Sequence, residues 1–139
     1  MKYFAVIDTN VLVSGLLKYH SIPGSLLELV FTDMITPVLN NEIESEYLSV
    51  LSRPKFHFSK EIINDIIQTF RLKGLYIDSS PINILLPDPK DVIFYEVVME
   101  QRKQSDTWLV TGNIKHFPNK SYVVTPRQML DIILKDVDL

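Results

Sequence analysis

The sequence predicts an α/β protein in which helices cover both faces of a central parallel sheet, so that the domain has three layers. Short apolar runs such as Tyr3-Phe4-Ala5-Val6-Ile7 lack alternating polar residues, which is typical of strands buried on both faces. Segments with apolar residues at helical spacing alternate with these runs. The length of 139 residues fits a single domain over residues 1–139.

The first half of the chain is divided by capping and helix-breaking residues. The expected elements are a strand at 3–7, a helix capped by Thr9 or Asn10 and running to Leu17, a second helix from Leu26 to Phe31 after a break at Pro23-Gly24, a strand from Met34 to Leu39, and a third helix that is capped by Asn40 or Asn41 and stops at Arg53-Pro54.

The second half continues the alternation of helices and strands. The expected elements are a helix from Ser59 to Lys73 closed by Gly74, a strand at Leu75 to Ile77, a helix opened by Asp88-Pro89 and running through Val98, a strand from Trp108 to Thr111 with a turn at Gly112, a strand from Tyr122 to Val124, and a last helix that starts at Pro126.

The composition limits the chemistry. The chain has no cysteine, so disulfides and thiolate metal ligands are excluded, and a bound metal would need oxygen or imidazole ligands. The net charge of −3 argues against binding nucleic acid through a global positive field. The chain opens with no signal-like segment and contains no apolar run approaching the roughly 20 residues that span a bilayer, so we expect a cytoplasmic protein without a membrane role.

The strongest single indication of a site is Asp8, which follows the first strand. Ligands of open parallel sheets bind beyond the carboxyl ends of the strands. Asp91 is expected in the first turn of the fifth helix, where a carboxylate also complements the helix dipole, and Asp88 is equally explained as a cap. On the third helix both Glu44 and Glu46 lie at edges of the apolar stripe, and their spacing does not choose between them.

Four segments together resemble a known family. They are Asp8-Thr9-Asn10-Val11-Leu12, the stretch from Glu46-Tyr47 through Leu51-Ser52-Arg53-Pro54-Lys55-Phe56, Asp88-Pro89-Lys90-Asp91, and Leu109-Val110-Thr111-Gly112-Asn113. In this order and spacing they resemble the PIN domain, in the branch that contains toxin components of toxin-antitoxin systems.

The resemblance implies a PIN-like domain with an acidic pocket that holds Mg²⁺ or Mn²⁺, and it selects Asp8, Glu46 and Asp91 as catalytic residues and metal ligands. Asn113 stands where many PIN domains have a fourth acid, and Val92 stands where the branch often has a second acid. Asn113 is thus a candidate fourth metal ligand with a neutral oxygen, so we expect one firmly bound metal and a second that binds with substrate. Hard divalent ions suit these oxygen ligands and activate water for phosphodiester hydrolysis.

Further polar residues are candidates for orienting ligands or contacting substrate. Those expected to orient ligands are Thr9, Asn10, Ser14, Asp88 and Thr111, and those expected to contact phosphate are Arg53, Lys55, His57, Lys60, Lys115, His116, Lys120 and Arg127. Phe56, Phe58 and Phe117 are candidates for stacking on bases.

The function implied by the resemblance is a metal-dependent endoribonuclease acting on single-stranded or structured RNA, as the toxin of a toxin-antitoxin pair. A small antitoxin protein and a homodimer or higher homo-oligomer are the expected partners. The alternative is a degenerate PIN scaffold that binds RNA or a protein without catalysis. A haloacid-dehalogenase-type phosphatase would need an acid where Asn10 stands, and a receiver domain would need an acidic pair that Lys2-Tyr3 does not supply.

Overall fold

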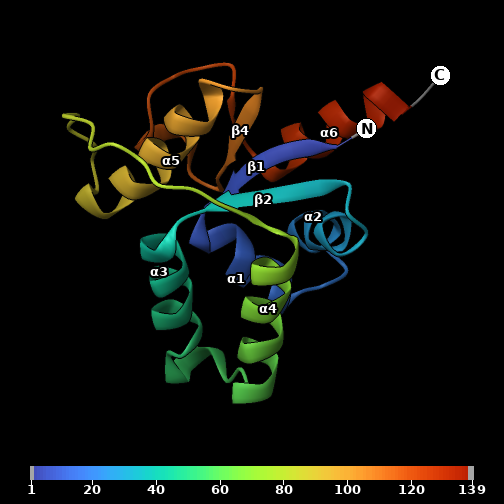
Figure 1. Ribbon diagram of the computed structural model, residues 1–139. Coiled ribbons are helices and arrows are strands. Elements are labelled where there is room, and N and C mark those ends of the chain that lie inside the picture. The colour runs from blue at the N-terminus through green and yellow to red at the C-terminus, as the bar shows by residue number, and fades with distance from the viewer. Residues whose placement is uncertain (1, 138–139) are drawn as a thin grey trace.

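A computed structural model describes residues 2–137 of the chain, with the side chain of residue 137 left out. Its five strands, all parallel, form one sheet in the order β3-β2-β1-β4-β5 (Figure 1). The strands are β1 (Tyr3–Ile7), β2 (Ile35–Leu39), β3 (Leu75–Tyr76), β4 (Thr107–Val110) and β5 (Val123–Val124). The predicted parallel α/β architecture is therefore confirmed.

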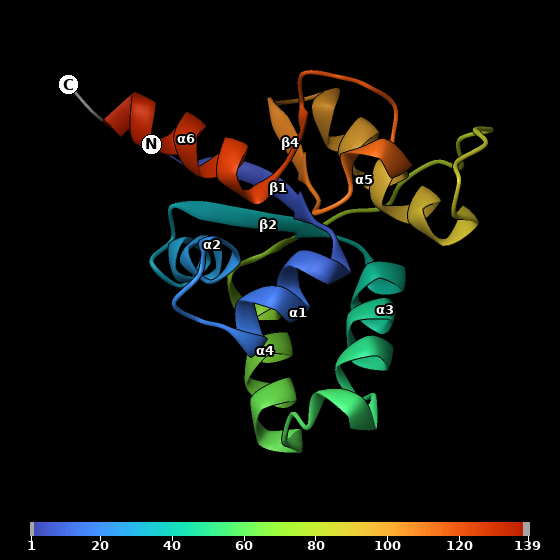
Figure 2. The same ribbon diagram turned by 180° about the vertical axis from the view of Figure 1, so that it is seen from behind.

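The helices lie on both faces of this sheet. They are α1 (Thr9–Leu17), α2 (Ile22–Phe31), α3 (Asn41–Leu51), α4 (Lys60–Lys73), α5 (Val92–Arg102) and α6 (Pro126–Val137). Helix α5 packs against β1, β2 and β4 from one side, whereas α1, α2 and α4 lie on the other (Figures 1 and 2). Helix α6 packs against α2 and so joins the second group.

The chain changes direction across the sheet at β1. Strand β1 is central, with Ala5 opposite Pro37 of β2 and Trp108 of β4. Connections from β1 lead first toward β2 and β3, and later connections lead to β4 and β5 on the other side. This reversal creates a crevice at the carboxyl ends of β1 and β4, which is where open α/β sheets bind their ligands.

The predicted start of the second helix is wrong. Helix α2 begins at Ile22, not Leu26, and it includes Pro23 and Gly24 in its first turn. Ser21 caps this turn by accepting a hydrogen bond from the backbone N–H of Gly24 at 3.2 Å. Pro23 is tolerated because backbone N–H groups in a first helical turn have no partner within the helix. A Cβ at position 24 would lie 1.9 Å from the Tyr19 carbonyl oxygen, so the close approach of the backbone requires glycine.

The segment before α5 also differs from the prediction. Asp88 caps a 3₁₀ turn, η2 (Pro89–Asp91), by accepting from the Lys90 amide at 3.0 Å. The α-helix starts only at Val92 and continues to Arg102, so Asp91 is its N-cap residue and does not lie in its first turn. Asp91 therefore stands at the junction of η2 and α5.

Other boundaries shift by one or two residues. Asp8, and not Thr9 or Asn10, is the N-cap residue of α1, although its side chain makes no capping bond. Asn40 is the cap of α3, one of the two expected candidates. Met34, Ile77, Thr111 and Tyr122 lie just outside the strands to which they were assigned.

Candidate active site

Carboxylates from three distant segments line one pocket at the carboxyl ends of β1 and β4. The pocket has a volume of about 220 Å³. Its lining residues are Asp8, Thr9, Asn10, Glu46, Val50, Arg53, Asp88, Lys90, Asp91 and Phe94. All three predicted catalytic acids therefore border the same cavity, which we call the carboxylate pocket.

Asp8 is the most buried acid of this pocket. Its side chain is 6% exposed, and the Thr111 hydroxyl donates to its Oδ2 at 2.7 Å. Burial raises the pKa of Asp8 to about 6, the Thr111 bond opposes this rise, and the negative charge of Asp91 adds to it. Asp8 therefore carries a carboxylate at neutral pH, held in a fixed orientation by Thr111.

Helix α3 presents one glutamate to the pocket and uses another for packing. Glu46 lines the carboxylate pocket. Glu44 is turned away: both its oxygens accept from Arg71, at 2.8 and 2.9 Å, and Oε1 also accepts from the Tyr76 hydroxyl at 2.6 Å. These bonds connect α3 to α4 and β3. Of the two glutamates between which the spacing did not choose, Glu44 therefore has a structural role.

Asp91 is connected to Asn113 through a histidine. Nδ1 of His116 donates to Oδ2 of Asp91 at 3.2 Å, and the Asn113 amide donates to Nε2 of His116 at 2.9 Å. With the side-chain amide nitrogen of Asn113 as donor, Nε2 of His116 is the acceptor and Nδ1 is the donor toward Asp91. Asn113 is not among the pocket-lining residues, so it reaches Asp91 only through His116.

The acids of the pocket influence one another. Burial raises the pKa of Asp91, the charge of Asp88 raises it further, His116 lowers it, and Glu46 makes a smaller contribution in the upward direction. Repulsion between these neighbouring carboxylates lowers the free energy of unfolding when no cation is bound. Arg53 and Lys90 lie at the same pocket and supply positive charge.

Asn10 connects the two strand ends that border the pocket. Its Oδ1 accepts a hydrogen bond from the backbone N–H of Gly112 at 3.2 Å. The Thr111 hydroxyl oxygen accepts one from the backbone N–H of Asn113 at 3.0 Å. The turn after β4 is thus held against the start of α1. Both Asn10 and Thr111 lie where the sequence had placed ligand-orienting residues.

Several predicted contacts lie elsewhere. Ser14 is exposed on α1 and does not border the carboxylate pocket. Lys55 lies over the ring of Phe56, which stacks on Phe58 with centroids 5.9 Å apart, and Lys60 lines a groove between α3 and α4. The remaining candidates outside the carboxylate pocket are His57, Lys115, Phe117, Lys120 and Arg127.

Sequence reasoning missed three residues of the site. Lys90 had been interpreted only as part of a motif, yet it lines the pocket. Val50 and Phe94 form apolar walls, and nothing in their helical spacing distinguishes a wall of a pocket from the core. The doublet Pro89-Lys90 within a capped turn was the one available signal for Lys90.

The donor set suits a hard divalent cation. Carboxylate oxygens of Asp8, Glu46 and Asp91 border one cavity, and the Thr9 hydroxyl there is buried without a hydrogen-bond partner among the described residues. Within residues 2–137, however, no three acids or histidines are already close enough to form a complete ligand cluster. Side-chain rotation would therefore have to accompany metal binding.

The domain has a three-layer α/β/α architecture, and its acids converge at the carboxyl ends of the strands, where open α/β sheets bind their ligands. The chain belongs to the PIN-domain family, since the family model matches residues 5–115, most of its length. PIN domains are typically nucleases, which supports hydrolysis of nucleic acids as the general activity. The matched range includes all three candidate catalytic acids.

A comparison with individual proteins gives a distant relative. The chain is 30% identical over 117 residues to an uncharacterized protein of Methanocaldococcus jannaschii, with 81% of this chain and 72% of that protein aligned. No solved structure gives a significant match. Within the described part of the chain, no helix is both long and apolar enough to cross a membrane.

Proposed function

We propose that this chain is a metal-dependent endoribonuclease whose catalytic residues are Asp8, Glu46 and Asp91. The observation that carries the proposal is their convergence, from β1, α3 and the turn before α5, on one pocket of a PIN domain. Mg²⁺ or Mn²⁺ is the proposed cofactor, with Asp8 as the most fixed ligand because Thr111 orients it.

The residues around the acids fit a phosphodiester substrate. When bound, a divalent ion would supply the positive charge that activates water and stabilises the leaving oxygen. Arg53 and Lys90 would hold the non-bridging phosphate oxygens, since both are pocket-lining cations. Thr111 and His116 would keep Asp8 and Asp91 oriented while the phosphate enters.

The test is cleavage of mixed single-stranded RNA with Mg²⁺ or Mn²⁺, repeated with a chelator and with single-stranded DNA. We expect RNA cleavage that the chelator abolishes, and a loss of at least 100-fold in Asp8→Asn, Glu46→Gln and Asp91→Asn, as for other essential groups that stabilise charge. Glu61→Gln, at an exposed glutamate of α4 outside the carboxylate pocket, is the matched control. Full activity in Asp8→Asn would remove the site assignment.

The second candidate is a degenerate PIN scaffold that binds RNA or protein without catalysis. Two observations favour it: Asn113 in place of an acid, and the absence of a preassembled ligand cluster within residues 2–137. The same assay separates the candidates, because a scaffold would bind labelled RNA and leave it intact with either metal.

As a toxin, the protein would act with a small antitoxin and as a homodimer or larger oligomer. This part of the proposal rests on the resemblance and on exposed apolar side chains, among which Leu72 is 84% and Leu85 98% exposed. Light scattering at tens of micromolar and purification from the native host test it. A strict monomer without a small co-purifying protein would contradict it.

A further inference from the structure

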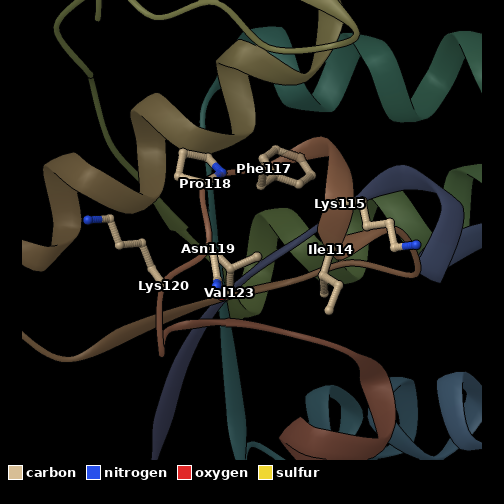
Figure 3. A pocket seen from close by; sticks show the side chains of 7 residues that line it. All are labelled: Ile114, Lys115, Phe117, Pro118, Asn119, Lys120 and Val123. Atoms are coloured by element: carbon tan, nitrogen blue, oxygen red, sulfur yellow. The ribbon is translucent and has the colours of Figure 1, made fainter.

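A second cavity lies against the 3₁₀ turn η3 (Ile114–His116), of which Ile114 and Lys115 line it. Its volume is about 410 Å³, within the range of roughly 300–1,000 Å³ that is typical of small-ligand sites. The segment between β4 and β5 forms almost all of it (Figure 3). We call it the β4–β5 pocket.

The β4–β5 pocket has an apolar lining. Its apolar residues are Ile114, Phe117, Pro118 and Val123. In Figure 3 the Phe117 ring and Pro118 lie on one side of the cavity, and Ile114 and Val123 lie across from them. Phe117 and Val123 are nearly buried, so they form fixed walls, whereas Ile114 is 40% exposed at the mouth. Such a slot suits a flat, largely apolar group.

The polar residues of the same pocket are all uncharged or positive. They are Lys115, Asn119 and Lys120, and no acid is among the lining residues. The two lysines extend from opposite ends of the cavity (Figure 3). Within residues 2–137 neither lysine makes an ion pair, and the Asn119 side chain makes no hydrogen bond. In a chain of net charge −3, this is a local concentration of unpaired positive charge.

The turn η3 links the two pockets through His116. Lys115 and Phe117 line the β4–β5 pocket, and His116 between them contacts Asp91 of the carboxylate pocket at 3.2 Å. A strand that extends from Asp91 along η3 reaches the residues that line the β4–β5 pocket. The pocket combines an apolar slot that fits a base, the Asn119 amide that can hydrogen-bond the edge of that base, and Lys115 and Lys120, which can bind phosphates.

We propose that the β4–β5 pocket is a nucleotide subsite that receives one unpaired base next to the cleaved bond of an RNA strand. The inference rests on the proposed ribonuclease function and extends it to the substrate. Lys115 and Lys120 hold successive phosphates, Phe117 and Pro118 contact the base, and Asn119 reads its edge. A base inside a duplex could not enter, so the subsite selects single-stranded segments.

The test separates binding from cleavage. Fluorescence anisotropy of a labelled 8-nucleotide single-stranded RNA is measured with Asp8→Asn protein, which cannot cleave under the proposed function. We expect each of Lys115→Ala and Lys120→Ala to weaken binding roughly 5-fold at about 0.1 M salt, as for one lost contact to a single-strand phosphate, and the salt slope to fall by about 0.7 for each. Lys18→Ala, an exposed lysine outside both pockets, is the matched control.

A second measurement addresses base recognition. Sequencing the cleavage products of a randomised single-stranded RNA should show a base preference at one position beside the cut, and Asn119→Ala should flatten that preference while cleavage at other positions continues. Unchanged RNA affinity and salt slope in both lysine variants would overturn the subsite, even if the protein cleaves RNA. Conversely, weakened binding in a protein that never cleaves would uphold the subsite and reject the nuclease.

Discussion

The hydroxyl of Tyr47 donates a hydrogen bond to the carbonyl oxygen of Ile7 at 2.5 Å. Both residues are buried, and each is next to a candidate metal ligand in the sequence. Ile7 directly precedes Asp8, and Tyr47 directly follows Glu46. Burial raises the pKa of Tyr47 well above its usual value, so the hydroxyl stays protonated and remains a donor. This bond fixes α3 against the end of β1 and sets the position of Glu46 relative to Asp8.

Removing the Tyr47 hydroxyl should affect both stability and metal binding. Tyr47→Phe leaves a buried carbonyl without this donor, which costs about 1–3 kcal/mol of unfolding free energy. Because α3 is then less firmly fixed, the rise in melting temperature with Mn²⁺ should also shrink. Tyr3→Phe is the control: its hydroxyl bonds Asp136 at the opposite end of β1, so it should lose stability and keep the metal response. Equal metal responses in the two variants would contradict the positioning role.

Asp8 should make the metal-free protein less stable as pH rises. Its folded pKa of about 6 exceeds its usual value of 3.8, so the folded state binds more protons than the unfolded state between these pH values. Stability from this group is therefore full below about pH 4 and is lost as pH rises through 6.

The Asp8→Asn variant measures this effect. Above pH 6 it should be more stable than the metal-free parent, by up to about 3 kcal/mol, and the advantage should vanish near pH 4. It should also lose the Mn²⁺-induced stabilisation. Urea denaturation at pH 4, 6 and 8 checks it, with Asp106→Asn, exposed before β4, as control. A pH-independent difference would mean that Asp8 is not the charged group responsible.

Glu44 and Glu46 should behave oppositely. Arg71→Met removes the bidentate partner of Glu44 and should lower the urea midpoint of unfolding, because Glu44 stays mostly buried. The Arg71 bond lowers the pKa of Glu44, so this contribution is present above pH 4.5 and is lost as pH falls through the folded pKa. Calorimetry with Mn²⁺ should give the parent affinity for Arg71→Met and no binding for Glu46→Gln. The reverse pattern would make Glu44 the ligand.

Asn113 should matter for metal binding only indirectly. Asn113→Ala removes the partner of His116 Nε2 but no acid of the carboxylate pocket, so Mn²⁺ affinity should fall no more than about 10-fold, the lower end for residues that orient a ligand. Asp91→Asn, in the same titration, should abolish binding. A loss in Asn113→Ala as large as in Asp91→Asn would identify Asn113 as a direct ligand.

Much of the fold could be predicted because buried parallel strands and amphipathic helices leave a strong pattern along the chain. The errors occurred where caps and tight turns, and not hydrophobic periodicity, decide the local structure. Pro23-Gly24 usually breaks a helix, but here the Tyr19 carbonyl packs against Gly24 and Ser21 caps the turn, so the helix starts earlier. The 3₁₀ turn before α5 carries no periodicity that distinguishes it from an α-helical start.

The candidate site was less predictable from residue spacing. A strand-end position suggested Asp8, but the choice between Glu44 and Glu46 depended on family resemblance, since the Arg71 and Tyr76 partners of Glu44 lie 27 and 32 positions away. The link from Asn113 through His116 to Asp91 joins residues that only the folded turn brings together. The assignment of Asp8, Glu46, Asp91 and Asn113 as metal ligands remains a prediction.

The hydrogen bond from Thr111 to Asp8 joins residues 103 positions apart, and β4 occupies the edge of β1 that β2 leaves open. Ribosomes deliver the amino-terminal part first, so β1, β2 and β3 can pair long before β4 exists. A nascent chain therefore holds Asp8 without its donor and beside an unfilled strand edge. Under the proposed function, an interrupted translation product would be inert toward RNA but prone to aggregate through that edge.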